Sequence, residues 1–339
     1  MIARGAARGS IGAAGPLVGL LVVAVILAAC FGAQPVSLAR AVADPTSFDR
    51  RILVDVRLPR VALAAIAGGG LAAVGAAFQA LLRNPLAEPF VLGVSGGAAL
   101  GATTAIAFGL GTATLLGAAL IPVAAFVGGL GATLLVYGVA AGARESSAGT
   151  SILLAGVMVN SIASALITAQ KSLVSPSRAQ HLMRWLTGFI DLSSPLALPL
   201  VAGYVALGVA VILADAGRLN LLALGDETAQ TLGVDVRALE RRVFLASSGV
   251  VGAIVSVTGL IGFVGLVVPH VVRRFVGPDH RRLLPCSILL GASSLVLCDL
   301  GARLVFLWVG DAPPVGAVTA LIGGPAFLVL LRRSTRPAF

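Results

Sequence analysis

The segment RRVFLASSGVVGAIVSVTGLIGFVGLVVPHVVRR (241–274) decides the class of this protein, because 30 residues without a formal charge lie between two arginine pairs. One helix over Val243–Val272 would be about 45 Å long, whereas the hydrocarbon core of a bilayer is about 30 Å thick. A single crossing would also leave one arginine pair outside, against the cytoplasmic preference of arginine. We therefore predict two short crossings, broken near Thr258-Gly259. Irregular backbone at that depth must be buried in protein or line a cavity.

The rest of the chain has the same membrane character. Of its 339 residues, 58% are hydrophobic and 11% are charged, whereas soluble domains are about a quarter charged. Several other apolar runs reach roughly 20 residues, the length of a membrane span, and the short alternating strands of a membrane barrel are not apparent. We predict an all-α polytopic membrane protein, with residues 1–339 in a single transmembrane domain.

The charge pattern reports membrane topology rather than a nucleic-acid partner. The net charge of +10 comes almost wholly from arginines at the ends of apolar runs, and an aromatic content of 5% argues against a base-stacking surface. The three cysteines stand singly in apolar runs, in a spacing that fits neither a metal site nor a disulfide framework.

The first 33 residues permit two interpretations. Arg4 and Arg8 precede an apolar run ending in Leu-Ala-Ala-Cys at Cys30, which resembles the cleavage box of a lipoprotein signal. Because more apolar runs follow, we favour an uncleaved first span over residues 14–33 that starts in the cytoplasm.

Further apolar runs complete the predicted topology. They lie at 61–82, from 90 onward, and at 115–141, 150–169, 196–213, 283–300 and 315–331. Together with the first span and the two crossings in 243–272 they give about ten transmembrane helices, with both termini cytoplasmic. This topology places the arginine-rich segment Ala39–Arg60 outside, an exception to the positive-inside preference that needs a reason.

The polar segment LNLLALGDETAQTLGVDVRALERR (219–242) reads as two short helices on the cytoplasmic side. Gly225 breaks an apolar cluster, Asp226 and Glu227 supply the negative charge that a helix start favours, and Leu232-Gly233 read as a helix stop. Asp235 can cap a further helix. The segment is either a contact surface for another protein or only a solvated loop.

Several kinds of chemistry have no sequence support. No segment matches the phosphate-binding pattern G-x-x-x-x-G-K-[ST], so the chain does not hydrolyse ATP itself. Acidic residues are scarce inside the spans, which argues against a proton- or sodium-coupled carrier. If the protein moves a solute uphill, the energy comes from a partner.

A set of motifs, in order along nearly the whole chain, resembles the FecCD-type permeases, which are BtuC-like, type II ABC importer permeases. The motifs are RLPR (57–60), QALLRNPLAEP (79–89) followed by LGVSGGAALG, LLALGDETAQTLG (221–233), GFVGLVVPHVVRR (262–274) with GPDHRRLLP (277–285), and PVGAVTALIGGPAFLVLL (314–331). The resemblance implies a membrane subunit that imports iron-siderophores, haem or vitamin B12. It also implies a homodimer with two cytoplasmic ATPases, which bind the ATP and magnesium, and an outer or lipid-anchored binding protein.

The resemblance assigns roles to individual residues. Arg57, Arg60 and Arg303 match positions that receive acidic residues of the binding protein, which would explain the outer arginines. Thr150 and Ser151 match a polar constriction of the path. The ATPase contact, within coupling helices at about 219–240, is carried by Leu221, Leu222, Ala223, Leu224, Gly225, Asp226, Glu227, Ala229, Leu232 and Gly233.

Two places depart from the family pattern and leave the substrate open. Ala312-Pro313 stands where the family usually carries a glutamate, and Gly188-Phe189 stands where glycine is usually followed by a small residue. We expect a bacterial inner-membrane permease for a ferric siderophore, with cobalamin or haem as alternatives and a standalone secondary carrier as the remote one.

Overall fold

The computed structural model describes residues 2–90, 93–110, 115–141, 148–191 and 197–334, and this part of the chain is helical with no strand. The elements in chain order are α1 (Ile2–Cys30), α2 (Leu38–Ala43), α3 (Phe48–Arg51), the π-helix η1 (Ile52–Arg57), α4 (Leu58–Leu81), α5 (Val94–Ala107), α6 (Leu115–Ala141), α7 (Ala148–Leu173), α8 (Pro176–Leu186), α9 (Ala197–Ala214), α10 (Ala216–Leu222), α11 (Asp226–Thr231), α12 (Val236–Thr258), α13 (Val264–Val276), α14 (His280–Val309) and α15 (Val315–Ser334).

The apolar run at 243–272 is broken where the sequence predicts. Helix α12 ends at Thr258 and α13 begins at Val264. Gly259 has a φ of +66° and lies so close to the backbone of Trp185 that a Cβ at this position would stand 2.1 Å from the Trp185 carbonyl oxygen. A glycine is therefore required here on both grounds. The buried flanks of the break agree with the rule that irregular backbone at membrane depth needs protein around it.

Membrane character is confirmed, but the number of crossings is not. Within the described residues, six helices are long and apolar enough to span a bilayer, and α1, α5 and α15 contain shorter apolar stretches. At 1.5 Å per residue the 13-residue α13 is only about 20 Å long. The segment predicted as an outer polar loop also differs, because a continuous helix already begins at Phe48 and runs into α4.

Helix α4 is the centre of the molecule. It packs against α14, α13, α12 and α9, and most of its 24 residues are buried. Close approach is built into its glycines: a Cβ on Gly75 would lie 1.9 Å from the Gly265 carbonyl oxygen of α13, and one on Gly68 would lie 2.2 Å from the Gly291 carbonyl oxygen of α14. Small residues let these backbones touch, as in other membrane bundles.

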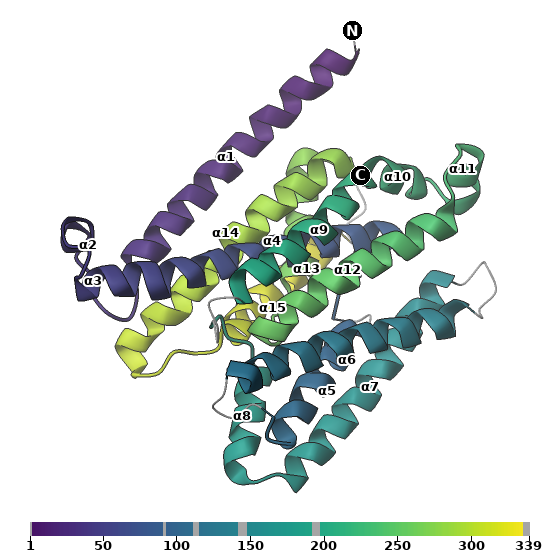
Figure 1. Cartoon of the computed structure of the whole chain (residues 1–339). Helices are drawn as coiled ribbons and strands as arrows, with labels where there is room; N and C mark the ends of the chain where they lie inside the picture. Colours follow the sequence, from purple (N-terminus) through teal and green to yellow (C-terminus); the bar gives the residue numbers. More distant parts are fainter. Residues whose placement is uncertain (1, 91–92, 111–114, 142–147, 192–196, 335–339) are drawn as a thin grey trace.

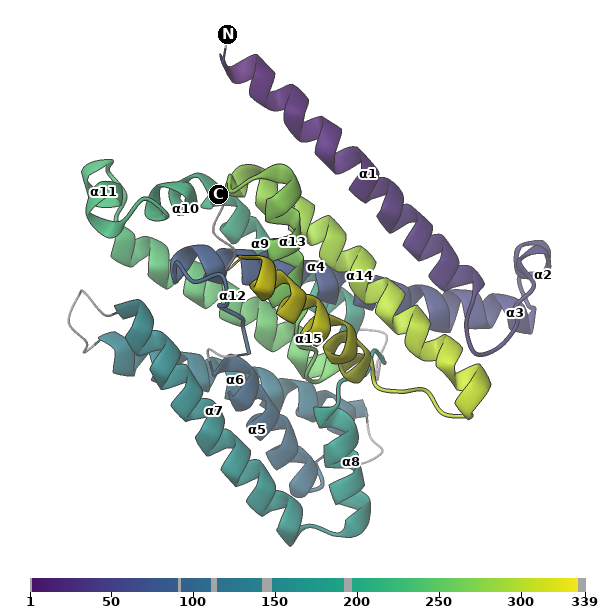
Figure 2. The same ribbon diagram turned by 180° about the vertical axis from the view of Figure 1, so that it is seen from behind.

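Two groups of helices lie side by side. Figures 1 and 2 show α5, α6, α7 and α8 gathered on one side of a group formed by α4, α9 and α12–α15, while α1 runs along α14 at the opposite edge. The glycine ridge at 93, 97 and 101 serves the contact of α5 with α6, since a Cβ on Gly101 would meet the Ala124 carbonyl oxygen at 2.1 Å. Close packing is thus the role of this ridge.

Candidate functional site

The polar segment at 219–242 is an ordered helical hairpin. Helices α10 and α11, which we call the α10–α11 hairpin (216–233), meet at Gly225, whose φ of +117° only glycine adopts readily. Helix α11 ends at Thr231, and Gly233 follows with a φ of +83°. The Asp235 carboxylate accepts a hydrogen bond of 2.9 Å from the Ala238 amide at the start of α12. The predicted break, stop and cap are all confirmed.

The hairpin divides its apolar side chains between two environments. Leu219, Leu222 and Ala229 are fully buried and attach the hairpin to the rest of the protein. Leu224 is 64% exposed and Leu232 is 56% exposed, one before and one after α11. Large apolar side chains held in the open on an ordered polar segment are available for contact with another protein.

Polar side chains tie the hairpin to three long helices. Arg83, just after α4, donates through Nε to the Leu222 carbonyl oxygen at 3.1 Å and forms an ion pair with Asp226. Asp215, immediately before α10, pairs at 3.1 Å with Arg242 of α12. A displacement of the hairpin would therefore act directly on α4 and α12 through these contacts.

The third set of contacts joins the hairpin to α14. Asn220 donates through Nδ2 to the Asp279 carboxylate at 2.6 Å, and its Oδ1 accepts from the His280 amide at 2.8 Å. Burial acts to raise the pKa of Asp279. This effect is outweighed by the hydrogen bonds from Asn220 and the Arg281 amide and by the nearby charges of Arg281 and Arg282, so the pKa of Asp279 is lowered. Asp279 thus stays ionised as the N-cap of α14.

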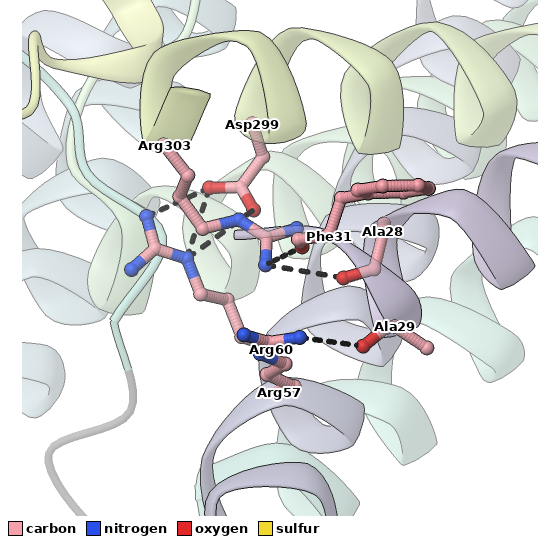
Figure 3. A network of polar contacts seen from close by, with 7 residues as sticks. All are labelled: Ala28, Ala29, Phe31, Arg57, Arg60, Asp299 and Arg303. Atoms are coloured by element: carbon pink, nitrogen blue, oxygen red, sulfur yellow. Dashed lines mark hydrogen bonds and ion pairs between the residues drawn. The ribbon is translucent and has the colours of Figure 1, made fainter. Parts of the chain in front are cut away.

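The predicted docking arginines form a different kind of cluster, shown in Figure 3. Arg57 is 4% exposed and donates through Nη1 to the carbonyl oxygens of Ala29 and Cys30, at 2.9 Å each. Arg303 is 6% exposed and donates to the Ala28 carbonyl oxygen at 3.1 Å. These carbonyls end α1 and lack helical partners, so the two guanidiniums cap that helix.

A single carboxylate pairs with two of the three arginines in this cluster. Asp299, with a side chain 1% exposed, forms ion pairs with Arg60 at 2.8 Å and with Arg303 at 3.0 Å. Asp299 and Asp215 each pair with an arginine three or four residues away and also with one on another helix. Docking of a binding protein on Arg57, Arg60 and Arg303 stays a prediction; of the three, Arg60 has the most exposed side chain.

The predicted gate lies at the start of α7. Thr150 and Ser151 fall in its first turn. Ser151 is half-buried, and the side chain of Thr150 lies outside the described residues. The structure does not bring this pair to the hairpin or to the arginine cluster, and its role in a transport path stays a prediction.

Sequence reasoning missed the residues that connect the hairpin to the bundle. Arg83 and Asn220 were not assigned roles, although Arg83 ends a long apolar run directly before Asn84-Pro85, which is a signal for a helix end. In the part of the chain that the structure describes, no three His, Cys, Asp or Glu side chains gather as a metal site. His280 instead hydrogen-bonds Asn220 through Nδ1 at 2.8 Å.

Comparisons with known proteins agree on one family. The model of the FecCD transport family matches residues 20–333. The cobalamin import system permease protein BtuC of Halobacterium salinarum is 43% identical over 83% of this chain and 73% of its own length. The Fe(3+) dicitrate transport system permease protein FecC of Escherichia coli is 35% identical over 94% of this chain and 96% of its own. A solved inward-facing structure, described as a metal-chelate type ABC transporter, superposes with a TM-score of 0.83 at 32% identity, over 94% of this chain and 98% of its own.

Proposed function

Because the chain belongs to the FecCD transport family, we propose that it is the membrane-spanning permease subunit of an ATP-driven ABC importer for a metal chelate, with a ferric siderophore as the first candidate substrate. Cobalamin and haem are the alternatives. Relatives at similar identity carry names for cobalamin and for ferric dicitrate, so similarity supports the importer class and leaves the choice of chelate to experiment.

The α10–α11 hairpin is the observation that carries this proposal. It stands outside the candidate spans, it holds Leu224 and Leu232 exposed, and it is attached to α4, α12 and α14 by polar side chains. A subunit without a nucleotide-binding loop needs such a surface to receive the motion of a separate ATPase. The ATPase would bind ATP and magnesium, and this chain would contribute no hydrolysis of its own.

The proposed assembly contains two copies of this chain, two cytoplasmic ATPases and an outer binding protein. Each copy is a multi-pass protein of the inner membrane with both termini cytoplasmic. The six candidate spans together with α1, α5, α13 and α15 supply the ten crossings of this arrangement, although these four helices are short in apolar length. The substrate would pass between the copies without chemical change, by alternating access.

Reconstitution tests the proposal. The chain is placed in liposomes with an ABC-type ATPase and a substrate-binding protein from the same genome, and ATP-dependent uptake of a ferric siderophore, cobalamin and haem is measured. We expect uptake of one chelate only when ATP and both partners are present, and no ATPase activity from the chain alone. Uptake driven by a proton or sodium gradient without ATP would show a secondary carrier instead.

The hairpin is tested in the same assay by replacing Asp226–Gln230 with a Gly/Ser segment of equal length. ATP hydrolysis should continue or fall while uptake is lost, because the ATPase no longer binds the hairpin of the permease. A matched variant carries the same five-residue replacement at Leu173–Ser177, a mostly exposed segment at the turn between α7 and α8. Normal coupling in the hairpin variant would refute the docking assignment.

A further inference from the structure

A cavity of about 430 Å³ lies between α5, α7, the end of α8 and the break that separates α12 from α13. Its polar lining comes from Ser95, Asn160, Ser164 and Thr168, with Leu260 contributed by the break. Among the described residues, none that lines it carries a charge.

Two buried polar atoms at the cavity have no hydrogen-bond partner within the described structure. Ser95 is 2% exposed and its Oγ is unpaired. Asn160 donates through Nδ2 to the Phe90 carbonyl oxygen at 2.5 Å, while its Oδ1 is unpaired. A buried polar group without a partner is unfavourable, so such atoms are normally satisfied by water or a ligand. The Ser95 hydroxyl can donate to a bound acceptor, whereas Asn160 Oδ1 only accepts and is suited to a water or another donor.

The start of α5 adds further donors at the same place. Helix α5 has 14 residues and begins after Gly93, which has a φ of +85° and offers no side-chain cap. The first-turn amides of a helix lack helical acceptors and carry a partial positive charge. Ser95 and Gly96, both in that turn, line the cavity. A Cβ on Gly96 would stand 2.2 Å from Asn160 Oδ1, so only glycine keeps this wall open.

We propose that this cavity binds an acceptor oxygen of the transported chelate, with the Ser95 hydroxyl and the first turn of α5 as donors. The inference rests on the proposed import function. The chemistry required is an oxygen that accepts hydrogen bonds, either the carbonyl oxygen of a neutral amide or hydroxamate or the carboxylate oxygen of an anionic chelate. A lining without charged side chains holds such a group by hydrogen bonds alone, which allows release during transport.

Chemical labelling tests access to the site without relying on uptake. In the assembled importer, with Cys30, Cys286 and Cys298 replaced by serine, Ser95→Cys is compared with Ser287→Cys. Ser287 is also fully buried with an unpaired hydroxyl, but it does not line this cavity. We expect a small methanethiosulfonate to label S95C at least tenfold faster than S287C. Equal rates would overturn the site.

Protection of the S95C thiol identifies the ligand. Labelling is repeated with a neutral ferric trihydroxamate, with anionic ferric dicitrate and with cobalamin. Slowing by the trihydroxamate or cobalamin supports a carbonyl oxygen, and slowing by the dicitrate supports a carboxylate oxygen. Rapid labelling that no chelate slows would overturn the assignment of a chelate to this cavity.

Uptake by Ser95→Ala and Ser287→Ala separates this inference from the proposed function. Loss of one hydrogen bond to a bound group corresponds to about tenfold in affinity, so S95A should raise the substrate concentration needed for half-maximal uptake about tenfold, with S287A near wild type. Equal behaviour of the two variants would overturn the site alone. No uptake of any chelate by the wild type would overturn the proposed function, and the ligand assigned here with it.

Discussion

The two ends of α4 carry arginine–aspartate clusters of opposite character. At the start of α4, Arg57 and Arg60 join Asp299 and Arg303 in a cluster in which only the Arg60 side chain, 26% exposed, is not buried. Beyond its end, Arg83 pairs with Asp226 at a site where the two side chains are 39% and 46% exposed. Figure 1 shows these ends far apart, with α1 and α3 at one and the α10–α11 hairpin at the other.

The two clusters differ in how easily their ion pairs can break. Buried charges leave water at a high cost and stay paired, so the first cluster holds the end of α1 against α14. Exposed ion pairs contribute only about 0–1 kcal/mol and break readily, so the second cluster can rearrange while the hairpin moves.

Asp299→Asn should be the most destabilising change. It leaves the buried Arg303 and the partly buried Arg60 without a counter-charge, and breaking a buried pair in this way costs about 3–5 kcal/mol. The measurement is thermal unfolding in detergent micelles. The control is Asp49→Asn, which removes a pair with Arg40, an arginine whose side chain is 78% exposed. Equal melting temperatures for the two variants would show that the first cluster does not stabilise the fold.

Gly75→Ala tests the packing of α4, the helix that joins the two clusters. The added methyl would meet the Gly265 backbone at 1.9 Å, and such overpacking typically costs about 1–3 kcal/mol. Gly301→Ala in α14 is the control, because a Cβ there meets nothing within 4 Å and alanine favours a helix. The expected result is a lower melting temperature for G75A and an unchanged or higher one for G301A. The reverse order would contradict the close contact of α4 with α13.

Asp279→Ala probes the tie from the hairpin to α14. Loss of the N-cap should cost about 1 kcal/mol at pH 7. The pKa of Asp279 is lower in the folded protein than its ordinary value of 3.8, so its contribution is present above pH 3.8 and is lost as the pH falls through the folded pKa. The stability difference between wild type and D279A, followed by denaturation from pH 7 to pH 3, should therefore shrink. A constant difference would contradict the ionised cap.

Arg83→Gln should have the smallest effect on stability, below about 1 kcal/mol, and a clear effect on coupling. Uptake per ATP hydrolysed should fall, since the hairpin loses its tie to α4. Arg218→Gln is the control, because Arg218 pairs with Asp215 three residues away in the same segment. Arg83→Gly should match R83Q in uptake without loss of stability, since Arg83 has a φ of +46° that glycine adopts more easily. Unchanged coupling in R83Q would show that Arg83 does not transmit movement from the hairpin to α4.

Much of the architecture was predictable because it depends on local composition. The uncharged run at 243–272 required a break, and the structure has it at Gly259. Gly225, Gly233 and Asp235 predicted the ends of short helices from their conformational preferences, and these ends were correct. The site at the start of α5 could not be predicted from the sequence. Ser95 and Asn160 are 65 positions apart, and only helix packing brings them to one cavity.

Hydrophobicity, glycine conformation and motif order are properties of the chain alone, so the membrane class, the family and the position of the helical hairpin follow from the amino-acid sequence. Which charges are buried depends on how the helices pack. Outer arginines predicted as a docking surface contact the carbonyls that end α1, and Asp299 lies between two of them. The physical reason is that a charge pattern along the chain reports where arginines occur, whereas their burial depends on helices that meet across more than 200 residues.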